Sequence, residues 1–220
     1  MTLDSGEVAV ARAILVATGL RDELPDLPGI RQRWGSQVHH CPYCHGFEVR
    51  GQAIVVIGGP VPALSLKQAG LLLRYSDRVT FVTNGIVPTP SDRHGLEALG
   101  ARVIDGTAAG FAGADGSLEG VTLADGSTVA CESVFVAPRP HPADAVLRSL
   151  GCAIDSATGF IAVDAAGQTS VPGVWAAGNV VNANAQVITA AGAGSFSAMA
   201  INGWLLQLDL DAALSAHSPE

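Results

Sequence analysis

The chain has 220 residues, of which 48% are hydrophobic and 15% charged, enough for a buried core in one large domain or two small ones. Its formal net charge of -8 and the scattering of its 12 Lys and Arg residues argue against a nucleic-acid partner. The sequence has no run of about 18 apolar residues, and Asp4 and Glu7 stand where a signal peptide needs positive charge, so we expect a cytoplasmic protein without a membrane span.

The first half of the chain has the pattern of a parallel sheet. Short apolar runs end in turns, and one of them leads through Gly58-Gly59-Pro60 into a helical pattern before the next strand. This succession is a βαβ unit, whose two strands lie parallel. The expected elements are, in chain order, a strand over 13–17 with a turn at Thr18-Gly19, a linker over 24–30, a strand over 53–57, a helix over 62–75 and a strand over 79–82.

The second half changes to short strands and then returns to the apolar pattern. Two Asp-Gly pairs, Asp115-Gly116 and Asp125-Gly126, predict turns of an antiparallel meander over 107–136. The prolines of 138–142 indicate a passage between domains. The expected elements are a short helix around 96–99, a strand over 101–104, the meander, a strand over 133–137, a strand with a glycine turn over 173–178 and a helix over 187–206.

Cys41 and Cys44 form a CxxC pair within the segment HHCPYCHG. Such a pair closes a small disulfide loop, in which one thiolate attacks and the other resolves the mixed disulfide. His45 follows directly, and an imidazole that titrates near neutral pH suits the transfer of the thiol proton. The sequence therefore favours redox chemistry at this cluster.

Three other interpretations of the CxxC segment stay open. The cysteines could be two buried thiols, they could attach a c-type haem, or they could bind zinc together with two of His39, His40 and His45. The haem interpretation lacks an export signal and the zinc interpretation lacks a second spaced pair, so no metal site is expected. The remaining cysteines and histidines are interpreted as packing residues (Cys131 and Cys152) and as surface residues (His94, His141 and His217).

Five segments of the chain stand in the order typical of one enzyme family. They are ILVATG (14–19), CPYCHG (41–46), VVIGGPVPA (55–63), VPGVWAAGNV (171–180) and QVITAAGAG (186–194). Together they resemble the thioredoxin-reductase-like branch of the FAD and pyridine-nucleotide-disulfide oxidoreductases. The resemblance extends over nearly the whole chain and implies an FAD-dependent thiol-disulfide oxidoreductase.

The resemblance also implies roles for single residues. Cys44 would face the flavin, and Cys41 would exchange with the substrate. Reductases of the family commonly have Asp where His45 stands, and CPxCHG is similar to the dithiol oxidases that close disulfides in gliotoxin and holomycin. By this resemblance His45 deprotonates a dithiol, the partner is a small-molecule dithiol or a thioredoxin-like protein, and the enzyme is a homodimer. The residues expected at the flavin are Thr18, Gly19, Gly178, Asn179, Val180, Gln186 and Val187.

Two positions depart from the pattern of an NADPH-dependent reductase. Pro60 stands where a phosphate-binding loop needs its second glycine, and proline has no N–H to offer a phosphate. The strand end at Thr83-Asn84-Gly85 lacks the acidic residue that holds a ribose hydroxyl and the arginines that hold a 2′-phosphate. We therefore expect poor NADPH binding and an oxidase whose flavin is reoxidised by oxygen.

The first strand and GxGxxG loop of the family, which bind the adenine half of FAD, have no counterpart in the sequence. We expect an α/β fold of two Rossmann-like nucleotide-binding domains with an antiparallel meander, the flavin domain being incomplete at its N-terminus. Residues 1–22 and 139–220 would belong to that domain, and residues 23–138 to an NAD(P)-binding-like domain that carries the CxxC pair. This predicts weak or absent FAD binding by the chain alone. The alternatives are an NADPH-dependent thioredoxin or disulfide reductase, a non-catalytic remnant or partner-dependent subunit, and a zinc-binding α/β protein.

Overall fold

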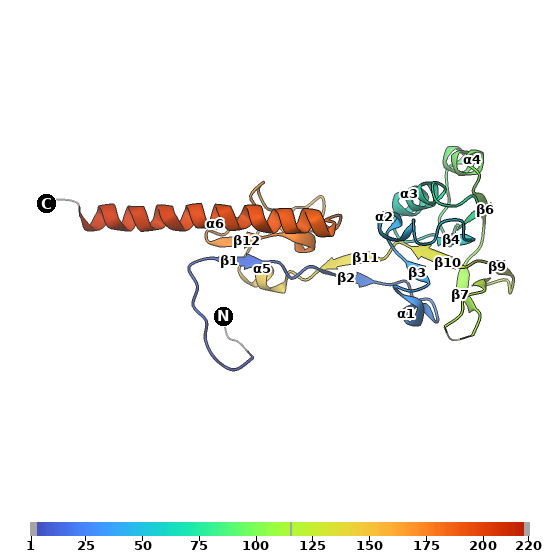
Figure 1. Ribbon diagram of the computed structural model, residues 1–220, viewed down its shortest axis with the longest axis horizontal. Helices are drawn as coiled ribbons and strands as arrows, with labels where there is room; N and C mark the ends of the chain where they lie inside the picture. The colour runs from blue at the N-terminus through green and yellow to red at the C-terminus, as the bar shows by residue number, and fades with distance from the viewer. Residues whose placement is uncertain (1–3, 115, 218–220) are drawn as a thin grey trace. The chain divides into compact units, whose positions relative to one another are not determined.

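The computed structural model describes residues 4–114 and 116–217 and confirms an α/β fold (Figure 1). The chain divides into two compact units. The central unit is Asp22–Arg139, and the split unit combines Met1–Arg21 with Pro140–Glu220. Strands β2 (Leu20–Glu23) and β11 (Arg139–Pro142), which contain the two chain passages between the units, pair with each other.

The central unit is built on a five-stranded sheet in the order β3-β10-β4-β5-β6. Each neighbouring pair in it is parallel, as the βαβ pattern predicts. All four residues of β4 and of β10 are buried, because a parallel sheet is covered on both faces, and this explains their uninterrupted apolar sequences. The strands are β3 (Val38–His39), β4 (Ile54–Ile57), β5 (Val79–Val82), β6 (Arg102–Ile104) and β10 (Ser133–Val136).

Helices α3 (Pro62–Leu72) and α4 (Pro90–Ala98) belong to the same unit. The prediction of a helix over 62–75 was correct for α3, which ends three residues earlier. The prediction of a short helix around 96–99 was wrong for the start of α4, which begins six residues earlier, at Pro90. The start of α4 is fixed by a capping box, in which the Thr89 side chain accepts from the Asp92 amide and Asp92 accepts from the Thr89 amide. The polar first turn shows no apolar periodicity, which is why the sequence pattern missed it.

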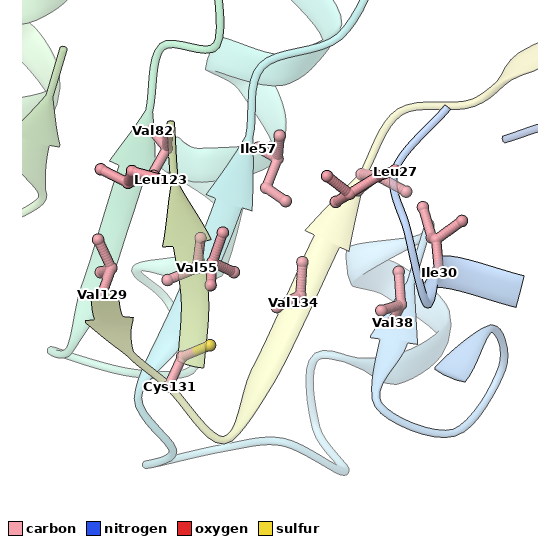
Figure 2. Packing of buried hydrophobic residues seen from close by; sticks show 12 residues of the cluster. Leu27, Ile30, Val38, Val55, Ile57, Val82, Leu123, Val129, Cys131 and Val134 are labelled. Atoms are coloured by element: carbon pink, nitrogen blue, oxygen red, sulfur yellow. The ribbon is translucent and has the colours of Figure 1, made fainter. Parts of the chain in front are cut away.

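The predicted meander packs on the face of the sheet that α3 and α4 do not cover. Strands β7 (Ala108–Ala112), β8 (Gly120–Leu123) and β9 (Thr128–Ala130) pair antiparallel. Gly126, with φ of 85°, makes the predicted turn between β8 and β9, whereas Asp115 of the other predicted turn lies outside the described residues. Figure 2 shows Leu123 and Val129 of the meander beside Val55 of the parallel sheet, and Ile30 beside Val38 in the same buried cluster.

The split unit contains a two-stranded parallel sheet of β1 (Ile14–Val16) and β12 (Val174–Ala176). It also contains α5 (Ala145–Ser149), the 3-10 turn η1 (Gly178–Val180) and the long helix α6 (Val187–Ala216). Helix α6 runs ten residues beyond the predicted end at 206. Among the described residues, no helix is both long and apolar enough to cross a membrane.

Candidate active site

The CxxC pair lies at the start of a one-turn helix, α2 (Pro42–His45), that the sequence pattern did not predict. The Cys41 carbonyl accepts hydrogen bonds from the amides of Cys44 and His45, both at 3.1 Å. Pro42 takes the first helical position, where its missing N–H is not needed. Helix α2 packs against α3 (Figure 1). The two cysteines are therefore one helical turn apart on a supported segment.

Gly46 closes this turn against its neighbours. Its amide donates to the Pro42 carbonyl at 2.8 Å. A Cβ atom at this position would lie 2.5 Å from the Pro42 oxygen and 2.6 Å from the Tyr75 ring. The segment after the cysteines is thus held too closely for any residue with a side chain.

The imidazole ring of His45 is held by a carboxylate at its edge and by a second ring on its face. Its Nδ1 lies 2.9 Å from Oε2 of Glu48, and its ring stacks on that of His39 with centroids 4.6 Å apart at 30°. Burial lowers the pKa of His39, and the nearby His45 lowers it further, against an opposing effect of Glu48. The predicted acid-base residue thus has a carboxylate partner that the sequence reasoning did not name.

The four cysteines differ in accessibility. Cys44 is exposed and Cys41 half-buried, whereas Cys131 and Cys152 are buried as predicted for packing residues. Burial raises the pKa of Cys131 to about 12, with a smaller contribution from Glu132, so this thiol is no nucleophile near neutral pH. Cys41 and Cys44 are therefore the more accessible of the four thiols. The predicted surface position is confirmed for His94 and His217, which are exposed, while His141 is half-buried.

The loop after β4 differs from a phosphate-binding loop in its contacts as well as its sequence. The Gly59 amide donates to the buried Ser65 hydroxyl at 2.9 Å, so this N–H is engaged within the protein. Asn84 donates from Nδ2 to the Gly58 carbonyl at 2.8 Å and accepts from the Ala108 amide at 3.0 Å. The side-chain amide of Asn84, the second residue after β5, thus holds this loop together. Its Nδ2 and Oδ1 atoms are both engaged within the protein and are not available to bind a ribose hydroxyl.

A cavity of about 670 Å³ lies at this loop in the central unit. Its lining includes Glu23, Asp26 and Arg139 beside the backbone of Gly58 and Gly59. Two carboxylates against one guanidinium give the lining a net negative charge, which disfavours the pyrophosphate of a dinucleotide. The residues present do not fit NADPH.

The residues expected at the flavin lie in the split unit, around the carboxyl ends of β1 and β12. Thr18 donates from Oγ1 to the Ala143 carbonyl at 2.6 Å, and the Gly19 carbonyl accepts from the Ala143 amide at 2.9 Å. Gly19 and Gly178 both have positive φ, 73° and 78°. Since β1 and β12 are parallel neighbours, these two glycine turns leave the same edge of the sheet.

The other expected flavin residues connect this edge to α6. Asn179 donates from Nδ2 to the carbonyls of Asn182 and Ala185 at 3.0 and 3.2 Å, so its amide braces the loop before the helix. Val180 is fully buried, so its side chain is part of the core. Gln186 is the N-cap residue of α6, and Val187, its first residue, is 89% exposed. A cavity of about 310 Å³ lies here, with a lining that includes Gly178 and Asn182.

Within residues 4–114 and 116–217, the structure contains no group of three or more His, Cys, Asp or Glu side chains that could hold a metal ion.

The family model of pyridine nucleotide-disulphide oxidoreductases matches residues 2–194. The chain belongs to this family. The match covers both units and confirms the family predicted from the five segments. This oxidoreductase chain is also similar to thioredoxin reductase sirT of Leptosphaeria maculans, at 29% identity over 224 residues, covering 96% of the chain and 68% of the relative. Similarity to thioredoxin reductase tcpT of Claviceps purpurea reaches 31% identity over 80% of the chain and 57% of the relative.

Two solved structures have a fold similar to that of the chain. The crystal structure of HlmI matches with a TM-score of 0.87 and 47% identity, covering 93% of the chain and 63% of HlmI. The oxidoreductase from Agrobacterium tumefaciens matches with a TM-score of 0.82 and 35% identity, covering 92% of the chain and 68% of that protein. The oxidoreductase chain described here thus spans between 57% and 68% of the length of these four proteins.

Gln68 of α3 is a residue of the site that no sequence motif indicated. Its Nε2 donates to the carbonyl of His40, next to Cys41, and to that of Val136 at 3.2 Å. The side chain is 4% exposed, and its Oε1 is buried without a hydrogen-bond partner in the described part of the chain. Gln68 therefore ties the segment before the cysteines to the end of β10. Only the spatial neighbourhood of α3 and β10 reveals this role.

We expect Gln68→Leu to lower the free energy of unfolding by about 2 kcal/mol, because the carbonyls of His40 and Val136 lose their donor and the one of Val136 is buried. Urea denaturation followed by circular dichroism measures the change. Lys67→Gln, an exposed neighbour on the same helix, is the matched control and is expected to change stability by less than about 0.5 kcal/mol. Equal stability of the Gln68→Leu and control variants would contradict a stabilising role of these two hydrogen bonds.

Proposed function

We propose that this chain is the CxxC-bearing part of an FAD-dependent thiol-disulfide oxidoreductase that oxidises a dithiol to a disulfide. The observation that carries the proposal is the cluster at α2, where Cys41 and Cys44 are one turn apart and His45 is 2.9 Å from Glu48. Membership of the pyridine nucleotide-disulphide oxidoreductase family and the similarity to thioredoxin reductases sirT and tcpT support thiol-disulfide chemistry. The substrate class we propose is a small-molecule dithiol, with a thioredoxin-like protein as the alternative.

The reaction begins at the oxidised cysteine pair. One substrate thiolate attacks Sγ of Cys41, the Cys41–Cys44 bond breaks, and Cys44 leaves as a thiolate. The second substrate thiolate then attacks the substrate sulfur bound to Cys41, which forms the substrate disulfide and releases Cys41. Cys41 and Cys44 are left as a reduced pair, and bound FAD would supply the acceptor for their two electrons, with oxygen as the final oxidant.

His45 supplies the proton transfer that this exchange needs. It accepts the proton of a substrate thiol and thereby forms the substrate thiolate that attacks Cys41. Glu48 holds the Nδ1 edge of the ring and stabilises the imidazolium that forms. The other ring nitrogen, Nε2, is then the one that exchanges protons.

The contacts of the nucleotide loop favour an oxidase over an NADPH-dependent reductase. The Gly59 amide is engaged by Ser65, Pro60 has no N–H, and the cavity lining carries Glu23 and Asp26. In the proposed direction, electrons enter from the dithiol and leave to oxygen. The deciding experiment compares turnover of a complete FAD-loaded form with a dithiol and oxygen against turnover with NADPH and a disulfide. Rapid NADPH oxidation would reverse the proposed direction.

The split unit suits the flavin-ring side of FAD. Two glycine turns at the carboxyl ends of β1 and β12 and the N-terminus of the 30-residue helix α6 form the kind of edge at which α/β sheets bind dinucleotides. Thr18, Gly19, Gly178, Asn179, Gln186 and Val187 would contact the cofactor from there. We propose the split unit as part of the flavin domain and the central unit as the NAD(P)-domain-like part. The cytoplasmic location and the homodimer remain predictions.

The surface of α6 supports a need for a further protein segment or a partner subunit. Several apolar side chains along the helix are more than half exposed, namely Val187, Ile188, Phe196, Met199, Leu206 and Leu214. Several large exposed apolar side chains along one helix are typical of a protein interface. A partner-dependent subunit is therefore the second candidate.

We expect the purified 220-residue chain to bind FAD weakly or not at all, because the sequence has no first-strand GxGxxG loop for the adenine half. Dialysis against excess FAD followed by the absorbance at 450 nm per protein measures the bound flavin. Free flavin carried through the same dialysis without protein is the control. A yellow, stoichiometric complex would contradict this prediction and would remove the main support for the partner-dependent candidate.

A further inference from the structure

His39 is the last residue of β3, and its ring lies on the opposite face of the sheet from Val38, whose side chain belongs to the meander core. On one side the ring meets Phe135 of β10, with centroids 5.3 Å apart. On the other side it stacks on His45 of α2, with centroids 4.6 Å apart and planes 30° from parallel. An imidazole is thus inserted between the sheet and the histidine that the proposed function uses.

The surroundings of His39 are those of a core residue. The side chain is 6% exposed, and Nδ1 is buried without a hydrogen-bond partner in the described part of the chain. A buried polar atom without a partner costs free energy that a phenylalanine or leucine at the same place would not. The surroundings therefore disfavour a proton on this ring and keep it uncharged.

The stacked pair can hold one proton more easily than two. Two imidazolium rings at 4.6 Å repel each other, and burial opposes a charge on His39 more than on the half-buried His45. The charged groups that act on His39 are His45 and Glu48, while Phe135 offers an uncharged ring. The carboxylate of Glu48 lies 2.9 Å from Nδ1 of His45.

We propose that His39 is a positioning residue for His45: its buried, uncharged ring is the flat support that fixes the plane of the His45 imidazole and keeps Nδ1 of that ring at Glu48. The face of a neutral aromatic ring also stabilises a cation stacked on it. With the plane fixed, Nδ1 stays on Glu48 and Nε2 stays available for the thiol proton. This inference rests on the proposed function, in which His45 exchanges that proton.

The test uses the reduced 220-residue chain without flavin and two variants of His39. His39→Phe keeps a flat uncharged ring, His39→Leu removes it, and His94→Leu on the exposed face of α4 is the matched control. The measurement is the rate at which iodoacetamide alkylates Cys41 and Cys44, followed from about pH 5 to pH 9 by mass spectrometry of the peptide that contains both. We expect His39→Leu to lower the rate at pH 7 about threefold to tenfold and to shift its pH profile, and His39→Phe and His94→Leu to change it less than about twofold.

An unchanged pH profile in a folded His39→Leu variant would overturn the proposal. Should this variant fail to fold, a titration of the wild-type histidine rings by NMR still decides. A His39 ring that takes up a proton between about pH 5 and pH 8 would overturn the inference, and a ring that stays neutral would support it. Because these measurements need no flavin and no turnover, their failure is distinguishable from a failure of the proposed dithiol oxidation.

Discussion

Cys41→Ser and Cys44→Ser are each expected to lower dithiol oxidation by the complete FAD-loaded form at least about 10³-fold, because a hydroxyl can neither exchange with a disulfide nor carry the electron pair. The loss is measured as oxygen consumption with a small dithiol. Cys131→Ala, in which a buried thiol with a raised pKa is removed, is the matched control and is expected to keep most of the turnover. A Cys41→Ser or Cys44→Ser variant with near-normal turnover would show that the oxidation does not pass through this pair.

The two variants also test which cysteine meets the substrate. The family resemblance assigns the exchange to Cys41, whereas the central unit exposes Cys44 and leaves Cys41 half-buried. The probe for this test is a linear disulfide, which the Cys41 thiolate of Cys44→Ser attacks with release of one probe thiol. We expect the mixed disulfide on Cys41 to accumulate in this variant, because Cys44, which would displace the bound probe thiol, is absent. Peptide mass spectrometry locates the adduct. An adduct that forms on Cys44 in the Cys41→Ser variant and not on Cys41 would reverse the two roles.

The parts of the site that are adjacent in sequence could be predicted from it, and the parts that meet in space could not. Cys41, Cys44 and His45 are consecutive in one motif, so their chemistry is visible in the sequence. Glu48 reaches His45 because α2 and the turn after it bring the two side chains together. His39 and Gln68 act through contacts between β3, β10, α2 and α3, and the sequence has no periodic signal for such contacts.

The fold shows the same division. Strands β4, β5 and β10 were predictable because each is a short run of mostly apolar residues in a sheet that is covered on both faces. The two-residue strand β3 was not predicted, because it is too short to show a pattern. The polar start of α4 and the one-turn helix α2 were not, since their ends are set by single capping or proline residues. Pro60 predicted from the sequence that the glycine loop binds phosphate poorly. The hydrogen bond from the Gly59 amide to the Ser65 hydroxyl is visible in the structure alone.

Gly58→Ala is expected to destabilise the central unit by about 3 kcal/mol or more, because its Cβ would overlap the carbonyl oxygen of Thr83 at the end of the neighbouring strand β5. Since that obstacle is backbone in the interior of the sheet, no side-chain rotation relieves it. Gly95→Ala in α4, where a Cβ meets nothing within 4 Å, is the matched control and is expected to stabilise by up to about 1 kcal/mol. Urea denaturation of both variants measures the difference.

This result would also separate two explanations of the glycine at the end of β4. If Gly58 served chiefly to let a pyrophosphate approach, an alanine would impair nucleotide binding and leave the fold intact. The overlap with Thr83 predicts the opposite, namely loss of the fold whether or not a nucleotide is bound. A Gly58→Ala variant within about 1 kcal/mol of the wild type would therefore contradict the packing explanation and would reopen a nucleotide role for the cavity beside it.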